Sequence, residues 1–280
     1  MKVEVNKDVF SEAVSFAVKL LPQRTTLPIL SGVLISAEDN AVTISSFDYE
    51  VSAKTRVDAA VDTAGQVLVS GRLLAEIASR LPDDVVNLEL SGSSLSVKSG
   101  SAKFSLATMP IEEYPNLPEV EGIAGSIAGD EFASAVSQVA TAASRDDVTP
   151  VITGVLLDIT ASSLTMMATD RYRVASRQLA WKSSGVSSEG MQALIPARTL
   201  AEIGKTFSHA GDITITINTG GERELVAFGS AERTVTTLLI KGSFPPVTKL
   251  FPAETPDYAV VSTQDLIDAT RRVALVLERE

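Results

Sequence analysis

An internal repeat is the feature of this 280-residue sequence that most constrains its fold. The segment Phe10-Ser-Glu-Ala-Val14 recurs as Phe132-Ala-Ser-Ala-Val136, and TLPILSGVLI at Thr26 recurs as VTPVITGVLL at Val148. Both recur at a spacing of 122 residues, so the alignment needs no gap. Eleven of the first 44 aligned pairs are identical, whereas this composition gives about three by chance. The repeat predicts two copies of one domain, here called repeat 1 and repeat 2, rather than a single large core.

The similarity continues to the end of each copy, with changes in spacing that indicate loops of different length. Arg72-Leu-Leu-Ala-Glu-Ile77 matches Arg198-Thr-Leu-Ala-Glu-Ile203, and Tyr114-Pro115 matches Phe244-Pro245. The duplication therefore covers whole domains.

A third copy begins near Tyr258, where Asp265-Leu-Ile-Asp-Ala269 repeats the start of the first helix. A complete third copy needs on the order of 100 further residues after Glu280, so we expect the chain to be truncated. Two proline-rich joints separate the copies. The expected domains are 1–120, 121–252 and 253–280, the last being the incomplete start of a third domain.

Each copy is predicted to contain a helix, strands, a second helix and further strands. Apolar residues at helical spacing mark the two helices of repeat 1: Phe10, Ala13, Val14 and Ala17 before Pro22, then Leu73, Leu74, Ile77 and Leu81. Short β-rich segments between turn signals predict strands at 32–36, 41–45, 87–91 and 103–107. The fold class is α+β with antiparallel sheets.

Composition excludes several functional classes. The chain has no cysteine and a single histidine, His209, which removes disulfides and most metallohydrolase or Ser-His-Asp chemistry. No apolar run reaches the roughly 18 residues that span a bilayer, and the N-terminus MKVEVNKDVF is not a signal peptide. We expect a cytoplasmic protein that is not an enzyme and needs no cofactor or metal.

One apparent catalytic motif fails. Gly204-Lys205-Thr206 is similar to the end of a phosphate-binding P-loop, but that loop needs a glycine where this chain has Thr199, and the segment has the pattern of a helix. His209 is interpreted as a surface residue and Trp181 as a packed one.

Several separated motifs together resemble the bacterial DNA polymerase III β sliding clamp family. They are RTTLPILSG at Arg24, ATDRYRVA at Ala168, and the segments MPIEEYPNLP and KGSFPPVTKLFP that close the two copies. The resemblance implies domains with two helices on the DNA side and antiparallel sheets outside. It also implies that the full-length protein forms a homodimeric ring, which encircles duplex DNA and gives the replicative polymerase its processivity.

The resemblance further implies a hydrophobic groove that binds short peptides of the polymerase, the clamp loader and repair polymerases. Carried over motif by motif, its residues are Ile152, Thr169, Arg171, Tyr172, Arg173, Val174, Pro245, Lys249 and Leu250. The family often has a small residue and histidine where this chain has Arg171-Tyr172, which indicates a different peptide preference. Asp170 is interpreted as structural, because repeat 1 keeps it as Asp48 but lacks the arginines.

Basic residues on or beside the predicted helices are candidates for sequence-independent contact with DNA phosphates. They are Lys7, Lys19, Arg24, Arg72, Arg80, Arg145, Arg198, Lys205, Arg271 and Arg272. From charge alone, the simpler interpretation is that these residues form surface ion pairs on a helix, as Arg72, Glu76 and Arg80 could at their spacing of four residues. The formal net charge of −11 fits an acidic outer surface that repels DNA, although it does not require one.

Two other functional classes compete with a clamp. A repeat-built scaffold that binds only proteins, without DNA, is the main alternative, and the basic residues at equivalent helical places argue against it. A nucleotide-using enzyme is disfavoured by the failed P-loop.

Overall fold

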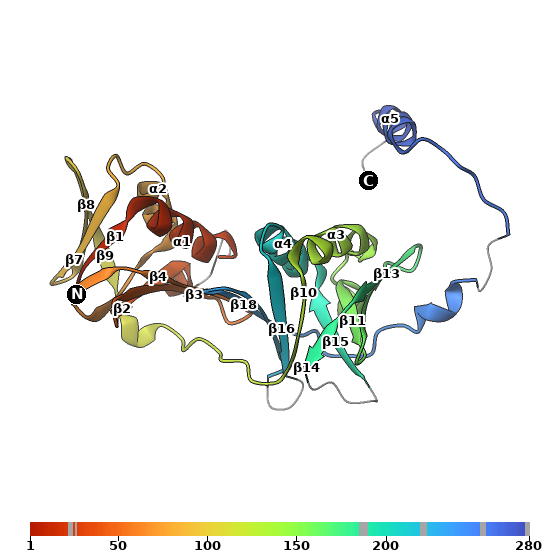
Figure 1. The fold of residues 1–280 in the computed structure, drawn as a ribbon, viewed down its shortest axis with the longest axis horizontal. Coiled ribbons are helices and arrows are strands. Elements are labelled where there is room, and N and C mark those ends of the chain that lie inside the picture. Colours follow the sequence, from red (N-terminus) through yellow and green to blue (C-terminus); the bar gives the residue numbers. More distant parts are fainter. Residues whose placement is uncertain (22–24, 26, 185–189, 219–222, 253–255, 278–280) are drawn as a thin grey trace. The chain divides into compact units, whose positions relative to one another are not determined.

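The computed structural model describes residues 1–280 except 22–24, 26, 185–189, 219–222, 253–255 and 278–280. The chain forms two compact units, Met1–Phe244 (unit 1) and Pro245–Glu280 (unit 2). Unit 1 contains repeats 1 and 2 (Figure 1).

Repeat 1 has two helices and nine strands among its described residues. In chain order they are β1 (Lys2–Asn6), α1 (Lys7–Lys19), β2 (Gly32–Glu38), β3 (Ala41–Phe47), β4 (Val51–Asp58), β5 (Ala60–Thr63), β6 (Gly65–Ser70), α2 (Gly71–Ala78), β7 (Val85–Ser91), β8 (Ser94–Ser99) and β9 (Ala102–Met109). Short 3-10 turns, η1 (Pro28–Ser31) and η2 (Ile111–Glu113), precede β2 and follow β9.

Repeat 2 contains the same series. Its elements are β10 (Ile123–Ala128), α3 (Gly129–Val139), β11 (Gly154–Ile159), β12 (Ser163–Thr169), β13 (Val174–Ala180), β14 (Lys182–Ser184), β15 (Met191–Pro196), α4 (Ala197–Phe207), β16 (Asp212–Asn218), β17 (Leu225–Ser230) and β18 (Arg233–Leu238). The 3-10 turns are η3 (Ala140–Ala142) and η4 (Pro150–Ile152).

Strand pairing is the same in both copies, as the repeat predicts. In repeat 1 the hydrogen-bonded neighbours follow the orders β5-β1-β7-β8-β9 and β6-β2-β3-β4. In repeat 2 the orders are β14-β10-β16-β17-β18 and β15-β11-β12-β13, and all pairs are antiparallel. In repeat 1 the two series join where Leu68 pairs with Met109. At the matching place in repeat 2, Ile240 N–H donates to the Leu194 carbonyl at 2.7 Å. The α+β class and the repeated architecture are thereby confirmed.

The helices of each copy pack as a pair against one face of the strands. The two pairs, α1 with α2 and α3 with α4, lie on the same side of unit 1 (Figure 1). The Asn6 side chain starts α1 by accepting the N–H groups of Asp8 and Val9, and Phe10 and Val14 are fully buried beneath it. Their spacing of four residues places them on one helix face, which explains why that face meets the sheet.

The predicted second helix is present, but its end differs from the prediction. Leu73 is 45% exposed although its neighbour Leu74 is buried, because the face toward the sheet passes through Leu74 and Ile77. Leu81 is buried but lies beyond the helix, which ends at Ala78. The predicted end of the first helix at Pro22 lies outside the described residues.

The two copies are joined by one continuous ladder and a shared core. Strand β4 pairs antiparallel with β18, from Val51 opposite Thr237 to Thr55 opposite Arg233. Phe16 of α1 packs into the core of repeat 2, with its ring 6.3 Å from that of Phe207. The Arg233 guanidinium lies over Phe16 and pairs with Glu12 at 2.7 Å. These contacts hold the copies in one arrangement.

The connector after η2 is fixed to repeat 1 by Tyr114. Its buried hydroxyl accepts the Phe47 N–H at 2.8 Å and donates to the Gly32 carbonyl at 3.3 Å. The hydroxyl therefore stands between the ends of β2 and β3, where the strands no longer pair directly. Burial raises the pKa of Tyr114 to about 12.

The remaining sequence interpretations concern single residues. Trp181 is packed against Gly125, where any side chain would collide with the indole, and His209 is exposed. Gly204, Lys205 and Thr206 lie inside α4, so they form no phosphate-binding loop.

The described residues of unit 2 include the 3-10 turn η5 (Val247–Leu250) and helix α5 (Thr263–Ala274). The Ser262 side chain caps α5 by accepting the Asp265 N–H at 3.3 Å. No residue of α5 is buried. Within the described ranges of both units, no helix is long and apolar enough to cross a membrane.

Candidate functional site

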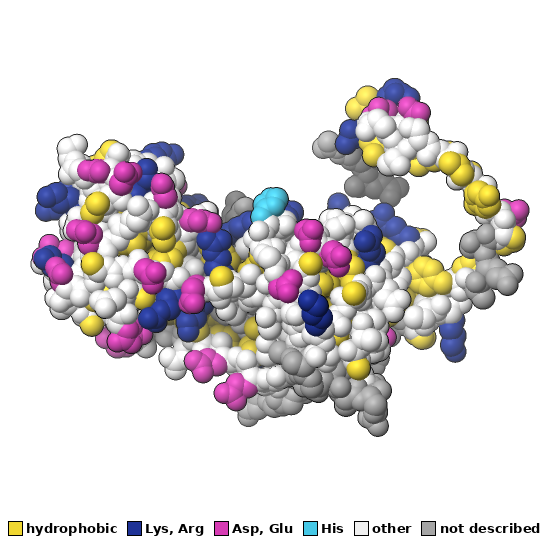
Figure 2. Space-filling view, viewed as in Figure 1, with side chains coloured by type: hydrophobic (Ala, Val, Ile, Leu, Met, Phe, Trp, Pro, Cys, Tyr) yellow, Lys and Arg dark blue, Asp and Glu magenta, His cyan; other side chains and the backbone are white. Residues whose placement is uncertain are grey.

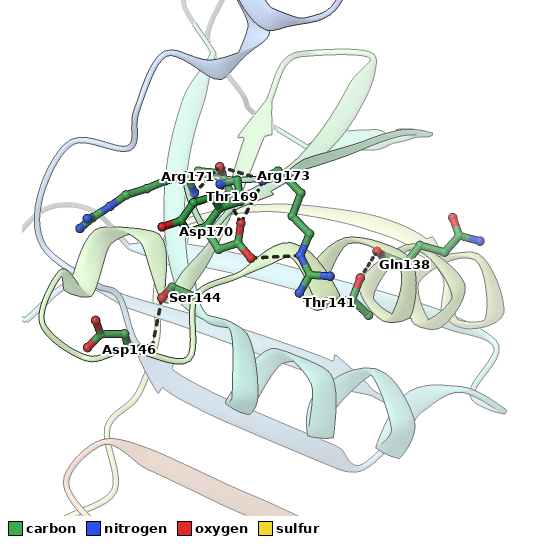
Figure 3. A network of polar contacts seen from close by, with 9 residues as sticks. Gln138, Thr141, Ser144, Asp146, Thr169, Asp170, Arg171 and Arg173 are labelled. Atoms are coloured by element: carbon green, nitrogen blue, oxygen red, sulfur yellow. Dashed lines mark hydrogen bonds and ion pairs between the residues drawn. The ribbon is translucent and has the colours of Figure 1, made fainter. Parts of the chain in front are cut away.

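The turn between β12 and β13 brings four of the predicted groove residues together (Figure 3). One Asp170 carboxylate oxygen accepts the backbone N–H groups of Tyr172 and Arg173 at 3.1 and 3.0 Å. The Thr169 hydroxyl donates to the Arg173 carbonyl at 2.8 Å. A short polar side chain that bonds the backbone two and three residues later stabilises a tight turn. The interpretation of Asp170 as a structural residue is confirmed.

Repeat 1 contains the same turn without the arginines. Asp48 accepts the N–H groups of Glu50 and Val51, and Tyr49 has a φ of 75°, matching the φ of 80° at Arg171. A positive φ is uncommon for residues other than glycine, so the turn imposes this conformation in both copies. Because Tyr49 adopts the same backbone conformation in repeat 1, the turn does not require arginine at position 171 of repeat 2.

Arg171 and Arg173 are held by different partners. The Arg173 Nε donates to the second Asp170 oxygen at 3.0 Å, while the Arg173 side chain stays 63% exposed. Arg171 reaches across to the Thr149 hydroxyl at 2.6 Å. Thr149 precedes η4, which carries the buried Ile152, so Arg171 links two elements that hold predicted groove residues. Thr149 was missed from the sequence because nothing local marks it as the partner of a residue 22 positions away.

The turn also sets the charge of Asp170. Burial raises the pKa of this carboxyl, but the hydrogen bonds from the Arg173 and Tyr172 N–H groups and from the Arg173 guanidinium outweigh burial. The pKa of Asp170 therefore lies below its ordinary value, and the carboxylate stays charged and able to orient Arg173.

The other predicted groove residues differ in exposure. Tyr172 is 97% exposed between the two arginines, Thr169 is buried, and Val174 is half-buried at the start of β13. Pro245, Lys249 and Leu250 belong to unit 2, where Leu250 is 69% exposed in η5. Their assignment to the groove stays a prediction.

Five of the predicted DNA-facing residues line two equivalent crevices in the helix layer. Lys19 and Arg72 line a crevice of about 440 Å³ beside the end of α1 and the start of α2. Arg145, Arg198 and Lys205 line one of about 450 Å³ beside the end of α3 and the start of α4. Arg72 and Arg198 are the matched arginines of the repeat. Both crevices thus have a cationic wall at the same place in each copy.

The remaining predicted DNA-facing residues are more scattered. Lys7 pairs with Asp8, and Arg80 donates to the Glu76 backbone carbonyl rather than to its carboxylate. Of the crevice residues, Lys205 also pairs with Glu202 at 2.6 Å, as expected for a surface ion pair on a helix. Arg271 and Arg272 lie on α5 in unit 2, and Arg24 lies outside the described residues. On the face seen in Figure 2, acidic and basic side chains are mixed over unit 1.

Comparison with known proteins places this geometry in a family. The family model for the N-terminal domain of the DNA polymerase III beta subunit matches residues 1–118, and the model for its central domain matches residues 126–246. The chain belongs to the bacterial β sliding clamp family. It is accordingly a subunit of a DNA polymerase processivity clamp, and the resemblance found in the sequence is confirmed.

Individual relatives agree. The β sliding clamp of Micrococcus luteus is 46% identical over 279 residues, which cover 100% of this chain and 89% of that protein. The crystal structure of the Bacillus subtilis clamp has a TM-score of 0.90 at 27% identity, over 100% of this chain and 75% of that one. A Helicobacter pylori β clamp bound to a DNA ligase peptide has a TM-score of 0.84 at 20% identity, over 99% and 76% of the two chains, and shows likeness of fold.

Proposed function

We propose that the chain holds duplex DNA against the α1–α4 side of unit 1 and carries partner proteins at the β12–β13 turn. The observation that supports the DNA side best is the pair of matched crevices, with Arg72 in one and Arg198 in the other. Phosphate contacts from side chains of this kind fix no base sequence, which is what sliding along DNA requires. The predicted domains, 1–120, 121–252 and the start of a third from 253, belong to the same proposal.

The partner side rests on the two arginines and Tyr172. Arg173 has its Nε occupied by Asp170, so its terminal N–H groups remain to donate to peptide carbonyls or a carboxylate. Tyr172 offers an exposed aromatic side chain beside them. We propose that a short hydrophobic peptide of the replicative polymerase, the clamp loader or a repair polymerase binds here. Ile152, Val174, Pro245, Lys249 and Leu250 would complete the site.

In this function no bond is made or broken, so we propose that the chain is not an enzyme. DNA polymerase partners, a homodimer of the full-length protein and a cytoplasmic location belong to the same proposal. A protein-only scaffold does not account for cations at equivalent positions of both helix pairs.

Peptide binding tests the partner side. Arg173→Ala or Leu250→Ala should weaken a fluorescent clamp-binding peptide by about 1 to 3 kcal/mol, as truncation of an interface anchor does. The measurement is a fluorescence anisotropy titration of each variant.

Arg80→Ala is the matched control, because Arg80 is an exposed arginine of repeat 1, far from this turn in sequence. It should leave peptide affinity unchanged. Loss of affinity in Arg80→Ala with normal binding by Arg173→Ala would refute the assignment.

A further inference from the structure

A hollow of about 450 Å³ crosses the joint between the two copies, here called the outer hollow. Its floor comes from four adjacent strands, β2, β3, β4 and β18, and the connector forms one wall. The lining residues used below are Ser45, Ser52, Thr236, Lys54, Arg56, Glu38, Glu119, Glu232, Leu34 and Leu117.

The outer hollow lies on the sheet face opposite the helices. Alternate residues of β3 and β4, such as Ile44 and Ala53, point into the hydrophobic cores, and Ser46 donates to the Ala17 carbonyl of α1. Because side chains alternate along a strand, Ser45, Ser52 and Lys54 point to the other side. The hollow therefore faces away from the cationic crevices, and none of its lining residues lines those crevices or belongs to the β12–β13 turn.

Three hydroxyl-bearing residues form the floor of the hollow. Ser45, Ser52 and Thr236 are 5%, 4% and 4% exposed, yet none of the three hydroxyls hydrogen-bonds to another described residue. Among the described residues, Trp181 Nε1 is the one side-chain polar atom that is both buried and unpaired, so these three hydroxyl oxygens reach solvent in the hollow, where a ligand can hydrogen-bond to them. Ser52 and Thr236 face each other across the β4–β18 pairing that joins the copies.

The fold does not require this chemistry. In repeat 2, the positions 122 residues after Ser45, Ser52, Lys54 and Arg56 are occupied by Met167, Val174, Ser176 and Gln178. The same strand positions thus carry two cations in repeat 1 and no charge in repeat 2. The polar floor is a property of the first joint and not of the repeated architecture.

Charge indicates what the hollow would bind. Lys54 and Arg56 are exposed on the central strand β4, and neither forms an ion pair with another described residue. Glu38, Glu119 and Glu232 stand on other elements of the lining. A polyanion such as single-stranded DNA would be repelled by these carboxylates. A ligand with one acidic group over Lys54 and Arg56 and one basic group near the carboxylates complements the charges of both signs.

We propose that the outer hollow binds an extended peptide of a partner protein, through an acidic residue over Lys54 and Arg56 with a basic residue close to it. Strands lie about 4.8 Å apart, so four strands span about 14 Å, the length of roughly four extended residues. The floor hydroxyls pair with the peptide backbone, and Leu34 and Leu117 contact its apolar atoms.

Backbone-amide NMR titration of the 280-residue chain tests this site. The probe is acetyl-Gly-Asp-Gly-Lys-amide, and its control is the same peptide with asparagine in place of aspartate. The aspartate peptide should shift the amides of Ser45, Ser52 and Thr236 and bind about tenfold more tightly, because a carboxylate between two cations makes charge-assisted bonds. Ser176 and Gln178 in repeat 2 should not shift.

Lys54→Gln with Arg56→Gln should abolish the preference for aspartate, while an otherwise unchanged spectrum establishes that the variant is folded. If the double variant does not fold, Lys54→Gln and Arg56→Gln are titrated separately, and each should reduce the preference for the aspartate peptide. Equal binding of the two peptides, shifts unaffected by the substitutions, or displacement of the peptide by a single-stranded oligonucleotide would overturn the proposal.

Discussion

Tyr114 shows how one side chain fixes the connector between the copies. Replacing it with phenylalanine keeps the ring but leaves the Phe47 N–H and Gly32 carbonyl without their bridge. Tyr114→Phe should lower the free energy of unfolding by about 1 to 3 kcal/mol, the cost of an unsatisfied buried polar pair. Tyr49→Phe, at a 43% exposed tyrosine, should change it by less than about 0.5 kcal/mol in the same urea titration.

The same hydroxyl predicts a pH dependence. The pKa of Tyr114 is raised to about 12 by burial, above the ordinary value of 10.0, so the folded protein holds this proton more tightly than the unfolded chain. The stabilisation is fully present below pH 10 and is lost as pH rises toward 12. An ultraviolet titration should show a phenol ionising near pH 12, and Tyr114→Phe should lack it; an unchanged titration would contradict this assignment.

At the residue scale, the sequence predicted the role of Asp170 but not the partners of the arginines beside it. The turn is local, because Asp170 bonds groups two and three residues away, and Asp48 repeats it. The bond from Arg171 to Thr149 depends on how two separate elements fold against each other, which no local pattern encodes. The helical pattern likewise does not say which of the adjacent Leu73 and Leu74 faces the sheet, and the structure buries Leu74 while Leu73 is 45% exposed.

At the scale of elements, the contact between α1 and repeat 2 decides whether the copies unfold together. Phe16 belongs to α1 but is 6% exposed within the core of repeat 2. Phe16→Ala should lower the free energy of unfolding by about 3 to 5 kcal/mol, because it leaves a cavity and removes the ring contact with Phe207.

Calorimetry measures this effect. The native chain should melt unit 1 in one transition, and Phe16→Ala should lower its melting temperature or split it into two. Val9→Ala, at a 42% exposed position of the same helix, is the control. A Phe16→Ala variant as stable as the Val9→Ala variant would show that the joint does not depend on this contact.

The strands themselves were easier to predict than their pairing across the joint. The segments predicted at 32–36, 41–45, 87–91 and 103–107 fall within β2, β3, β7 and β9. The pairing of β4 with β18 joins residues about 180 positions apart, and it depends on how one whole copy meets the next. A pattern within one strand carries no information on such a partner.

At the scale of the whole molecule, the repeat determined the architecture. A fixed spacing of 122 residues predicted one fold twice, and the strand order in both copies is the same. What the repeat left open was which surface each charged residue faces, since that depends on the pairing of helices within each copy.

The central claim is that the helix side of unit 1 contacts DNA phosphates through the two matched crevices. Its most direct measurement is the salt dependence of affinity for a random-sequence duplex. Each phosphate contact contributes about 0.9 to the slope of log affinity against log salt, so Arg72→Ala with Arg198→Ala should reduce the slope by about 2. The control, Lys98→Ala with Lys103→Ala, removes two exposed lysines from β8 and β9 and should leave the slope unchanged. An unchanged slope in the arginine variant, or an equal loss in the lysine variant, would contradict the account.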